Sequence, residues 1–341
     1  MIHLKQRLIV AHEPAFRGFA RTVVCTLLLG GFILLALGVN AGEPEPARAG
    51  NDSAALAEQI ATFSRDLERL RRFMGLSRAS ELDIGIHTTI PRDLYFQSLT
   101  LWEQTDRLSF EASRTRAQPL PRPTGDIELQ DVLAQLRAAH QLLRQIMHSL
   151  QIADTSGAVN GSDAAPADHF ATLLTLNRQL NLLLERHISA SDVYQEVTLA
   201  IAYSARLLAR YPGAVRIPAE PPFESDQQPS DVYLRLIECL HSIVRIFDRL
   251  GLAVLRIDTR QTELDHLQPG DVYLIAAMIV SQLDFLYKHL AIVQPPPQPI
   301  YPGLKFPAHT YQRAGILQAQ LQQLERYLAS GQAAQAVPTR P

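Results

Sequence analysis

Cysteine and lysine are both scarce in this chain of 341 residues. The only cysteines are Cys25, in an apolar N-terminal segment, and Cys239, in an expected helix, so we expect no internal disulfide. Lysine occurs only at Lys5, Lys288 and Lys305, and the arginines are spread among acidic residues to give a formal net charge of −2. Because the sequence contains no basic stripe, it predicts a protein that does not bind nucleic acid.

The sequence also lacks the short motifs that carry common enzyme chemistry. It contains no Gly-rich phosphate loop, no Gly-x-Ser-x-Gly elbow, no Cys-x-x-Cys pair and no His-Glu-x-x-His helix. We therefore predict that the protein is not an enzyme and that it carries no cofactor.

Two Glu-x-x-His pairs are the hints of a metal site that the sequence offers. Glu238 with His241, and Glu263 with His266, have the spacing that places both side chains on one face of a helix, as in di-iron bundles. The second pair falls in an expected linker, and no further carboxylates stand out to complete a ligand set. These four residues are weak candidates, and we expect no bound metal.

Residues 1–41 have the pattern of a signal sequence. Basic residues near the N-terminus are followed by an apolar run from Thr22 to Val39, and Val39-Asn40-Ala41 fits a signal-peptidase site. Cleavage after Ala41 is one reading, and the other is an uncleaved signal anchor, since an apolar run of about 18 residues reaches the lower limit for a membrane span. In either case we expect the body to be exported, either periplasmic or anchored to the inner membrane outside the cytoplasm.

A short sequence motif of the form Pro-x-Asp-x-Tyr, which we call the recurring phrase, occurs several times along the chain. Several neighbouring copies lie 33 to 42 residues apart, a spacing typical of helical repeat proteins. Proline disfavours helix in the residue before it, and the Asp can accept bonds from the free amides of the first turn, so each copy predicts a helix start. The aromatic residue two places later opens an apolar stripe and is expected to anchor the core. The expected anchors are Asp93, Tyr95, Asp126, Asp168, Phe170, Asp192, Tyr194, Asp231, Tyr233, Asp271, Tyr273 and Tyr311.

Strand patterns are sparse, so the sequence predicts an all-α fold of about eight long amphipathic helices, in a multi-helix bundle or an irregular helical repeat. The expected helices span about 52–75, 93–113, 126–150, 168–186, 192–211, 231–250, 271–292 and 309–329. The short connection after 168–186 favours an antiparallel hairpin with 192–211. Later linkers of about 18 residues are long enough to run back along the bundle and set consecutive helices parallel.

The expected domain organisation follows from these elements and from composition. The segments are a signal peptide or anchor at 1–41, a membrane-proximal heptad helix at 42–75, a first helical half at 76–152, a flexible linker at 153–165, a second helical half at 166–330 and a disordered tail at 331–341.

The first expected helix carries an apolar repeat with alternating spacings of four and three. This is the spacing of a coiled-coil seam, and it allows a homodimer through residues 52–75. The alternative is that the helix is the first member of the bundle and packs against its own chain. Three heptads lie near the lower limit for an independent coiled coil, which favours this alternative. The repeat consists of Leu56, Ile60, Phe63, Leu67, Leu70 and Met74.

Two classes of function fit these observations. The first is an exported, non-enzymatic helical scaffold that contacts an envelope or membrane protein partner. The alternative is a periplasmic ligand- or metal-binding sensory bundle that passes its signal to a partner protein. The repeated helices and the missing catalytic motifs favour the scaffold.

Overall fold

The computed structural model describes residues 46–78, 84–123, 125–153, 166–184, 187–259, 262–292, 297–298 and 300–330. The expected leader at 1–41 and the expected tail at 331–341 lie outside these residues, as does all but Ala153 of the expected linker at 153–165. The described residues are mostly helical, which confirms the expected all-α class.

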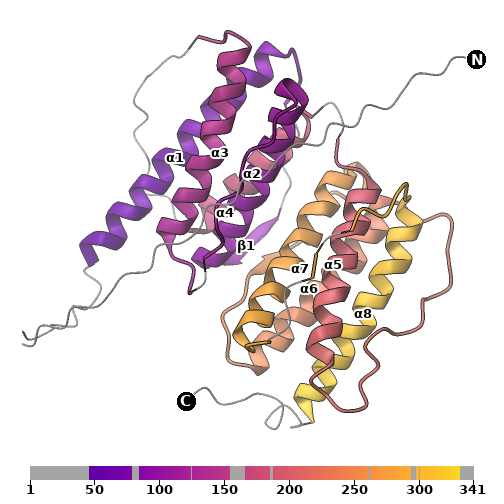
Figure 1. Cartoon of the computed structure of the whole chain (residues 1–341). Helices are drawn as coiled ribbons and strands as arrows, with labels where there is room; N and C mark the ends of the chain where they lie inside the picture. The colour runs from indigo at the N-terminus through magenta and orange to yellow at the C-terminus, as the bar shows by residue number, and fades with distance from the viewer. Residues whose placement is uncertain are drawn as a thin grey trace, which may run out of the picture. The chain divides into compact units, whose positions relative to one another are not determined.

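The described part of the chain contains eight α-helices, one short two-stranded sheet and one turn of 3-10 helix (Figure 1). The helices are α1 (Pro46–Phe73), α2 (Pro91–Ser113), α3 (Leu129–Ser149), α4 (Pro166–Asn181), α5 (Ala190–Leu208), α6 (Pro229–Arg249), α7 (Pro269–His289) and α8 (Pro307–Ala329). The antiparallel strands are β1 (Gly85–Thr88) and β2 (Arg256–Asp258), and the 3-10 turn is η1 (Leu264–His266).

The recurring phrase begins helices, but two residues earlier than the sequence suggested. In α2 the proline is the first helical residue and Asp93 the third, and the Asp93 carboxylate accepts a hydrogen bond from the backbone N–H of Ile90 at 3.1 Å. Proline suits the first position because its missing N–H would have no helical partner there, and a carboxylate at the third position reaches back to the free N–H before the helix. The same bond is made by Asp131, Asp192, Asp231 and Asp271, and by the Nδ1 atom of His309.

The start of α3 requires a correction. Asp126 was expected to open this helix, but α3 begins at Leu129, and Asp131 occupies the third helical position. Asp126 therefore lies in the preceding connection. In this copy the proline and the aspartate are three residues apart instead of two, so the copy does not match the first and third positions of a helix, and Asp131 fills the third position instead.

The aromatic residues of the phrase have two different environments. Tyr95, Phe170 and Tyr233 are buried in the core, as expected of anchors. Tyr194, Tyr273 and Tyr311 are only half-buried. Tyr194 and Tyr311 lie under basic side chains, with the Arg235 guanidinium carbon 3.4 Å from the ring centre of Tyr311. Half of these residues therefore lie at the boundary of the core, and two of them pack on cations.

The helices form two groups with the same packing order. In the first group α1 and α2 each pack against both α3 and α4, and in the second group α5 and α6 each pack against both α7 and α8 (Figure 1). The helices correspond in sequence order, α1 with α5 through α4 with α8. The same arrangement of four helices therefore occurs twice along the chain.

The helices within the second group all run in the same direction. The first residues of α5 to α8 and the residues three places later line one narrow space, so all four helices begin at the same end. The long connections therefore return along the group, as their length allowed. Those lining residues are Ala190, Val193, Pro229, Val232, Pro269, Val272, Pro307 and Thr310.

The expected hairpin between α4 and α5 is not formed. α4 packs against α1 and α2, whereas α5 packs against α7 and α8. Each helix buries its apolar face in its own group, and this burial outweighs the closeness of the two helices in sequence. The connection is ordered locally by Asn181, whose side-chain oxygen accepts a hydrogen bond from the backbone N–H of Ile188 at 3.0 Å.

Contacts between the two groups are made by α2, α4, α7 and the small sheet. The guanidinium of Arg92 donates to the Gln282 side-chain oxygen at 2.7 Å, and the Gln282 amide donates to Asp93 at 2.8 Å. These hydrogen bonds fix the start of α2 to the second half of α7. The two strands also pair across the groups, since β1 belongs to the connection after α1 and β2 to the connection after α6.

The apolar repeat of α1 is used within the chain. Its first five residues are buried, while Met74 is 41% exposed. The side chains pack on α3 and α4, as the single-chain alternative expected. A homodimer through residues 52–75 would have to use other side chains of the helix.

Of the helices described, α7 has the length and apolar composition of a membrane span, but most of its side chains are buried in the bundle, as in the core helix of a folded domain.

Candidate functional site

The expected metal candidates do not form a site. Glu238 and His241 lie on the exposed face of α6 with 4.0 Å between the carboxylate and Nδ1, and their side chains are 63% and 49% exposed. Glu263 directly precedes η1 and His266 ends it, and both are exposed. Within the part of the chain that the structure describes, no group of three or more metal-ligating side chains could hold an ion.

A cavity of about 380 Å³ lies between α2, α5 and α7, where the two groups meet. Each helix contributes a stripe of residues three or four apart, which places them on one face. The stripes are Phe96, Thr100 and Glu103 of α2, Glu196, Leu199 and Tyr203 of α5, and Tyr273, Ala277, Val280 and Asp284 of α7. We call this the inter-group cavity.

Two carboxylates in the inter-group cavity lack partners. No hydrogen bond or ion pair joins Glu103 or Glu196 to another described residue, although both line the cavity. Burial, together with the nearby charges of Glu103 and Asp192, raises the pKa of Glu196 to about 8. Burial also raises the pKa of Glu103 to about 6, against the opposing charge of Arg122. Glu103 remains accessible to solvent within the cavity, so its charge is better screened than that of the half-buried Glu196.

The other acid of the cavity is already satisfied. Asp284 accepts a hydrogen bond from the Tyr203 hydroxyl at 2.7 Å and pairs with the Lys288 ammonium at 2.8 Å. Burial and the Asp284 charge raise the pKa of Tyr203 well above its usual value, so the hydroxyl remains a donor. The Tyr273 side chain also faces the cavity. Aromatic rings, two carboxylates without a hydrogen-bond partner and the exposed Arg122 side chain thus surround one space.

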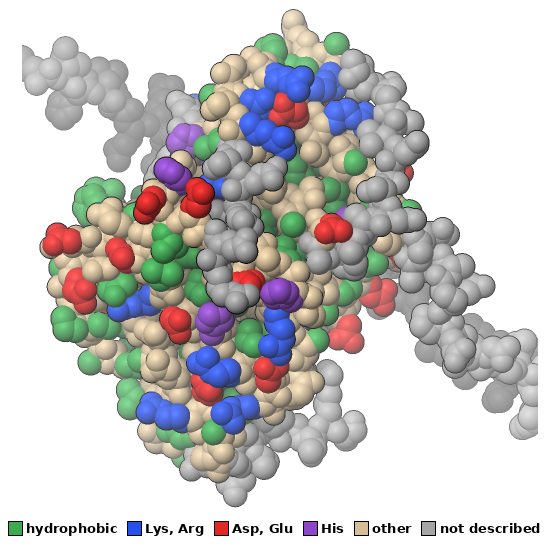
Figure 2. Space-filling model, turned by 180° about the vertical axis from the view of Figure 1, so that it is seen from behind, with side chains coloured by type: hydrophobic (Ala, Val, Ile, Leu, Met, Phe, Trp, Pro, Cys, Tyr) green, Lys and Arg blue, Asp and Glu red, His purple; other side chains and the backbone are tan. Residues whose placement is uncertain are grey.

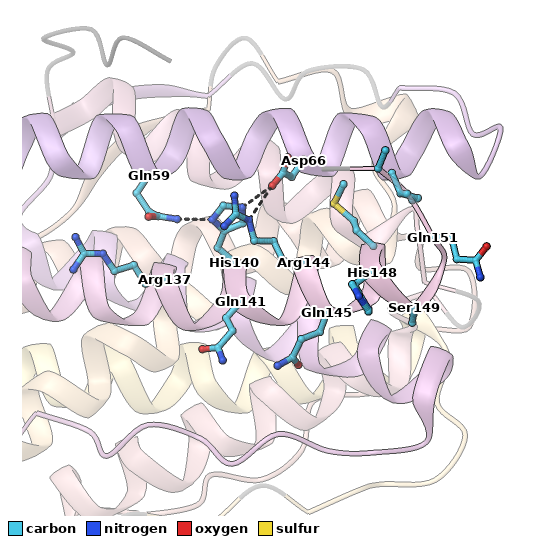
Figure 3. Close-up of a pocket in the computed structure, with 13 residues that line it drawn as sticks. Gln59, Asp66, Arg137, His140, Gln141, Arg144, Gln145, His148, Ser149 and Gln151 are labelled. Carbon is cyan, nitrogen blue, oxygen red and sulfur yellow. Dashed lines mark hydrogen bonds and ion pairs between the residues drawn. The ribbon is translucent and has the colours of Figure 1, made fainter. Parts of the chain in front are cut away.

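A second, larger cavity of about 1310 Å³ is a groove along α1 and α3 (Figure 3). At its floor the His140 ring lies between Gln59 and Asp66, with Nδ1 2.7 Å from the Gln59 amide nitrogen and Nε2 2.9 Å from the Asp66 carboxylate. Asp66 also pairs with Arg69 at 3.3 Å and lies 3.6 Å from the Arg144 Nε atom. We call this the α1/α3 groove.

The His140 geometry fixes the position of its proton. The Gln59 amide donates to Nδ1, so Nε2 carries the hydrogen and donates to Asp66. Burial lowers the pKa of His140, and the hydrogen bond to Asp66 opposes that shift. His140 is therefore a neutral residue that holds the floor of the α1/α3 groove in place.

The surface charge is patchy. On the face shown in Figure 2, acidic and basic side chains are intermixed over much of the surface, and near the top several basic side chains gather around an acidic one. No continuous basic stripe crosses this face, unlike the surfaces that follow a nucleic-acid backbone.

Few of the residues that line the inter-group cavity and the α1/α3 groove were candidates in the sequence analysis. Tyr273 was expected in the core and instead lines the inter-group cavity. In the sequence, Glu103 and Glu196 each interrupt an apolar stripe, and this interruption was the available sign of a polar site. A glutamate on an exposed helix face gives the same pattern, so the sign was not specific. The pairing of Asp66 with His140 joins two helices and has no signature in the sequence.

Comparisons with protein-family models, with curated proteins and with solved structures found no match for this chain.

Proposed function

We propose that this protein is an exported helical bundle that binds a small cationic ligand, such as an organic ammonium compound, in the inter-group cavity. The observation that carries the proposal is the pair of carboxylates, Glu103 and Glu196, which face one cavity without a partner. The volume of about 380 Å³ falls in the range typical of sites for small molecules.

The electrostatics favour a positively charged ligand. Two carboxylates that share a cavity repel one another, and an ammonium group between them would relieve this repulsion and donate hydrogen bonds to both. The rings of Phe96 and Tyr273 offer the aromatic faces that often accompany ammonium recognition. The pair therefore suits a cation better than an anion or a neutral compound.

Binding would be linked to proton release. With its pKa raised to about 8, Glu196 holds a proton at neutral pH, and a cation would displace it. The affinity for a cation should therefore increase as the pH rises from 6 to above 8.

The position of the inter-group cavity suggests how binding would be communicated. α2 belongs to the first group, and α5 and α7 belong to the second, so a ligand would contact both. A ligand that prefers one packing of α2 against α7 shifts the population towards that packing. We propose that an envelope partner reads this change, in line with the sensory alternative.

A thermal-shift screen with the purified full-length protein tests the proposal. At pH 8.5, ethylammonium, choline and putrescine are each compared with a neutral alcohol of matched size. We expect at least one ammonium compound to raise the unfolding temperature, and Glu196→Gln to abolish the shift. Glu238→Gln, on the exposed face of α6, is the matched control and should retain it. Equal shifts with the neutral compounds, or an unchanged response in Glu196→Gln, would contradict the proposal.

A further inference from the structure

The exposed face of α3 presents a row of hydrogen-bond donors along the α1/α3 groove. Its members are all exposed, and four of them are three or four residues apart, which places them on one side of the helix, while Gln145 directly follows Arg144 at the edge of that side (Figure 3). From the first to the last, the helical rise gives a length of about 16 Å. The row consists of Arg137, Gln141, Arg144, Gln145 and His148.

The single acid lining the groove is already neutralised. Asp66 is 4% exposed and is contacted by His140, Arg69 and Arg144. The contact uses the Nε atom of Arg144, and no described residue accepts a hydrogen bond from its terminal nitrogens. Arg137 has no acidic partner among the described residues. The guanidinium groups of Arg137 and Arg144 are thus available for a ligand, and the contact with Asp66 holds that of Arg144 in place.

We propose that the α1/α3 groove binds an extended acidic segment of a partner protein. A length of about 16 Å corresponds to about five residues of extended chain. The arginines match carboxylates in charge and geometry, and the glutamines can bond to the backbone of the segment. The alternation of Arg and Gln along the row suits a peptide, because a peptide offers charged side chains and neutral amides in alternation.

This site is separate from the proposed ligand cavity. The row lies on α3, and the floor is formed by Gln59 and Asp66 of α1 with His140 of α3, whereas the inter-group cavity is lined by α2, α5 and α7. Binding of an acidic segment therefore does not depend on the cation site, and the variant Glu196→Gln should bind the peptide as the wild type does.

Fluorescence anisotropy tests the proposal with the full-length protein and two labelled pentapeptides, one of five glutamates and one of five glutamines. We expect the glutamate peptide to bind, more weakly at higher salt, and the glutamine peptide not to bind. The double variant Arg137→Gln/Arg144→Gln should weaken binding roughly tenfold, since exposed charge pairs contribute modestly. Its unfolding temperature should stay near that of the wild type, because both side chains are exposed and Asp66 keeps its contacts with Arg69 and His140.

The matched control is Arg216→Gln/Arg326→Gln, which removes the same charge from exposed positions of the second group. It should bind the glutamate peptide like the wild type. Equal losses in the two double variants would show that net charge alone attracts the peptide, and would overturn the proposal. Binding of anionic phospholipid vesicles or of double-stranded DNA through Arg137 and Arg144, without peptide binding, would overturn it as well.

Discussion

The raised pKa of Glu196 makes a direct prediction about stability. In the folded protein this carboxyl binds its proton more tightly than in the unfolded chain, where its pKa is near the ordinary value of 4.5. Its contribution to stability is therefore complete below about pH 4.5. That contribution is lost progressively as the pH rises to about 8, where the folded protein must ionise the group beside Glu103.

The magnitude follows from the shift. One pKa unit corresponds to about 1.4 kcal/mol, so a change from 4.5 to about 8 sets an upper limit of about 5 kcal/mol. Glu196 is half-buried beside a cavity open to water, which screens its charge, so we expect about 1–2 kcal/mol. In a domain of this size that difference moves the unfolding temperature by roughly 2–8 °C.

The assay compares thermal unfolding of the wild type and Glu196→Gln at pH 5, 7 and 9 by circular dichroism. Gln has nearly the same shape and cannot ionise, so the two proteins should agree at pH 5 and the variant should be the more stable at pH 9. Glu238→Gln should follow the wild type throughout. A difference between the wild type and Glu196→Gln that stays constant with pH would refute the reasoning.

Three further predictions concern helix starts and the buried thiol. Asp271→Ala removes a cap and an ion pair with an arginine of α4, so urea unfolding should show a loss of about 3 kcal/mol, against about 1 kcal/mol for Asp231→Ala, which removes a cap alone. Gly270→Ala places a Cβ against an asparagine side chain of α4, so its unfolding temperature should fall measurably. Burial raises the pKa of Cys239 to about 12, so in the variant Cys25→Ser a thiol reagent should label the protein only after denaturation.

The helix starts show what local sequence can specify. A proline followed two residues later by an aspartate satisfies the first turn within a few residues, so the phrase identifies helices wherever it occurs. It did not locate the start of α3, where Asp131 rather than Asp126 occupies the third helical position. It also did not separate buried aromatic residues from those that pack on cations, because that difference depends on the neighbouring helix.

The pairing of helices lies beyond such local rules. The short connection between α4 and α5 suggested a hairpin, yet each helix buries its apolar face in a different group. An amphipathic stripe predicts that one face of a helix is buried, but it does not predict which other helix that face packs against. The repeated packing order of α1–α4 and α5–α8 was therefore visible only in the structure.

The sequence by itself determined the helical class, the approximate helix positions and the apolar face of each helix, because these depend on interactions within one or two turns. The tertiary structure alone decided which helices meet and hence which polar residues share a space. Glu103 with Glu196, and Asp66 with His140, come from helices far apart in the chain, and only the packing of those helices brings their charges close enough to interact.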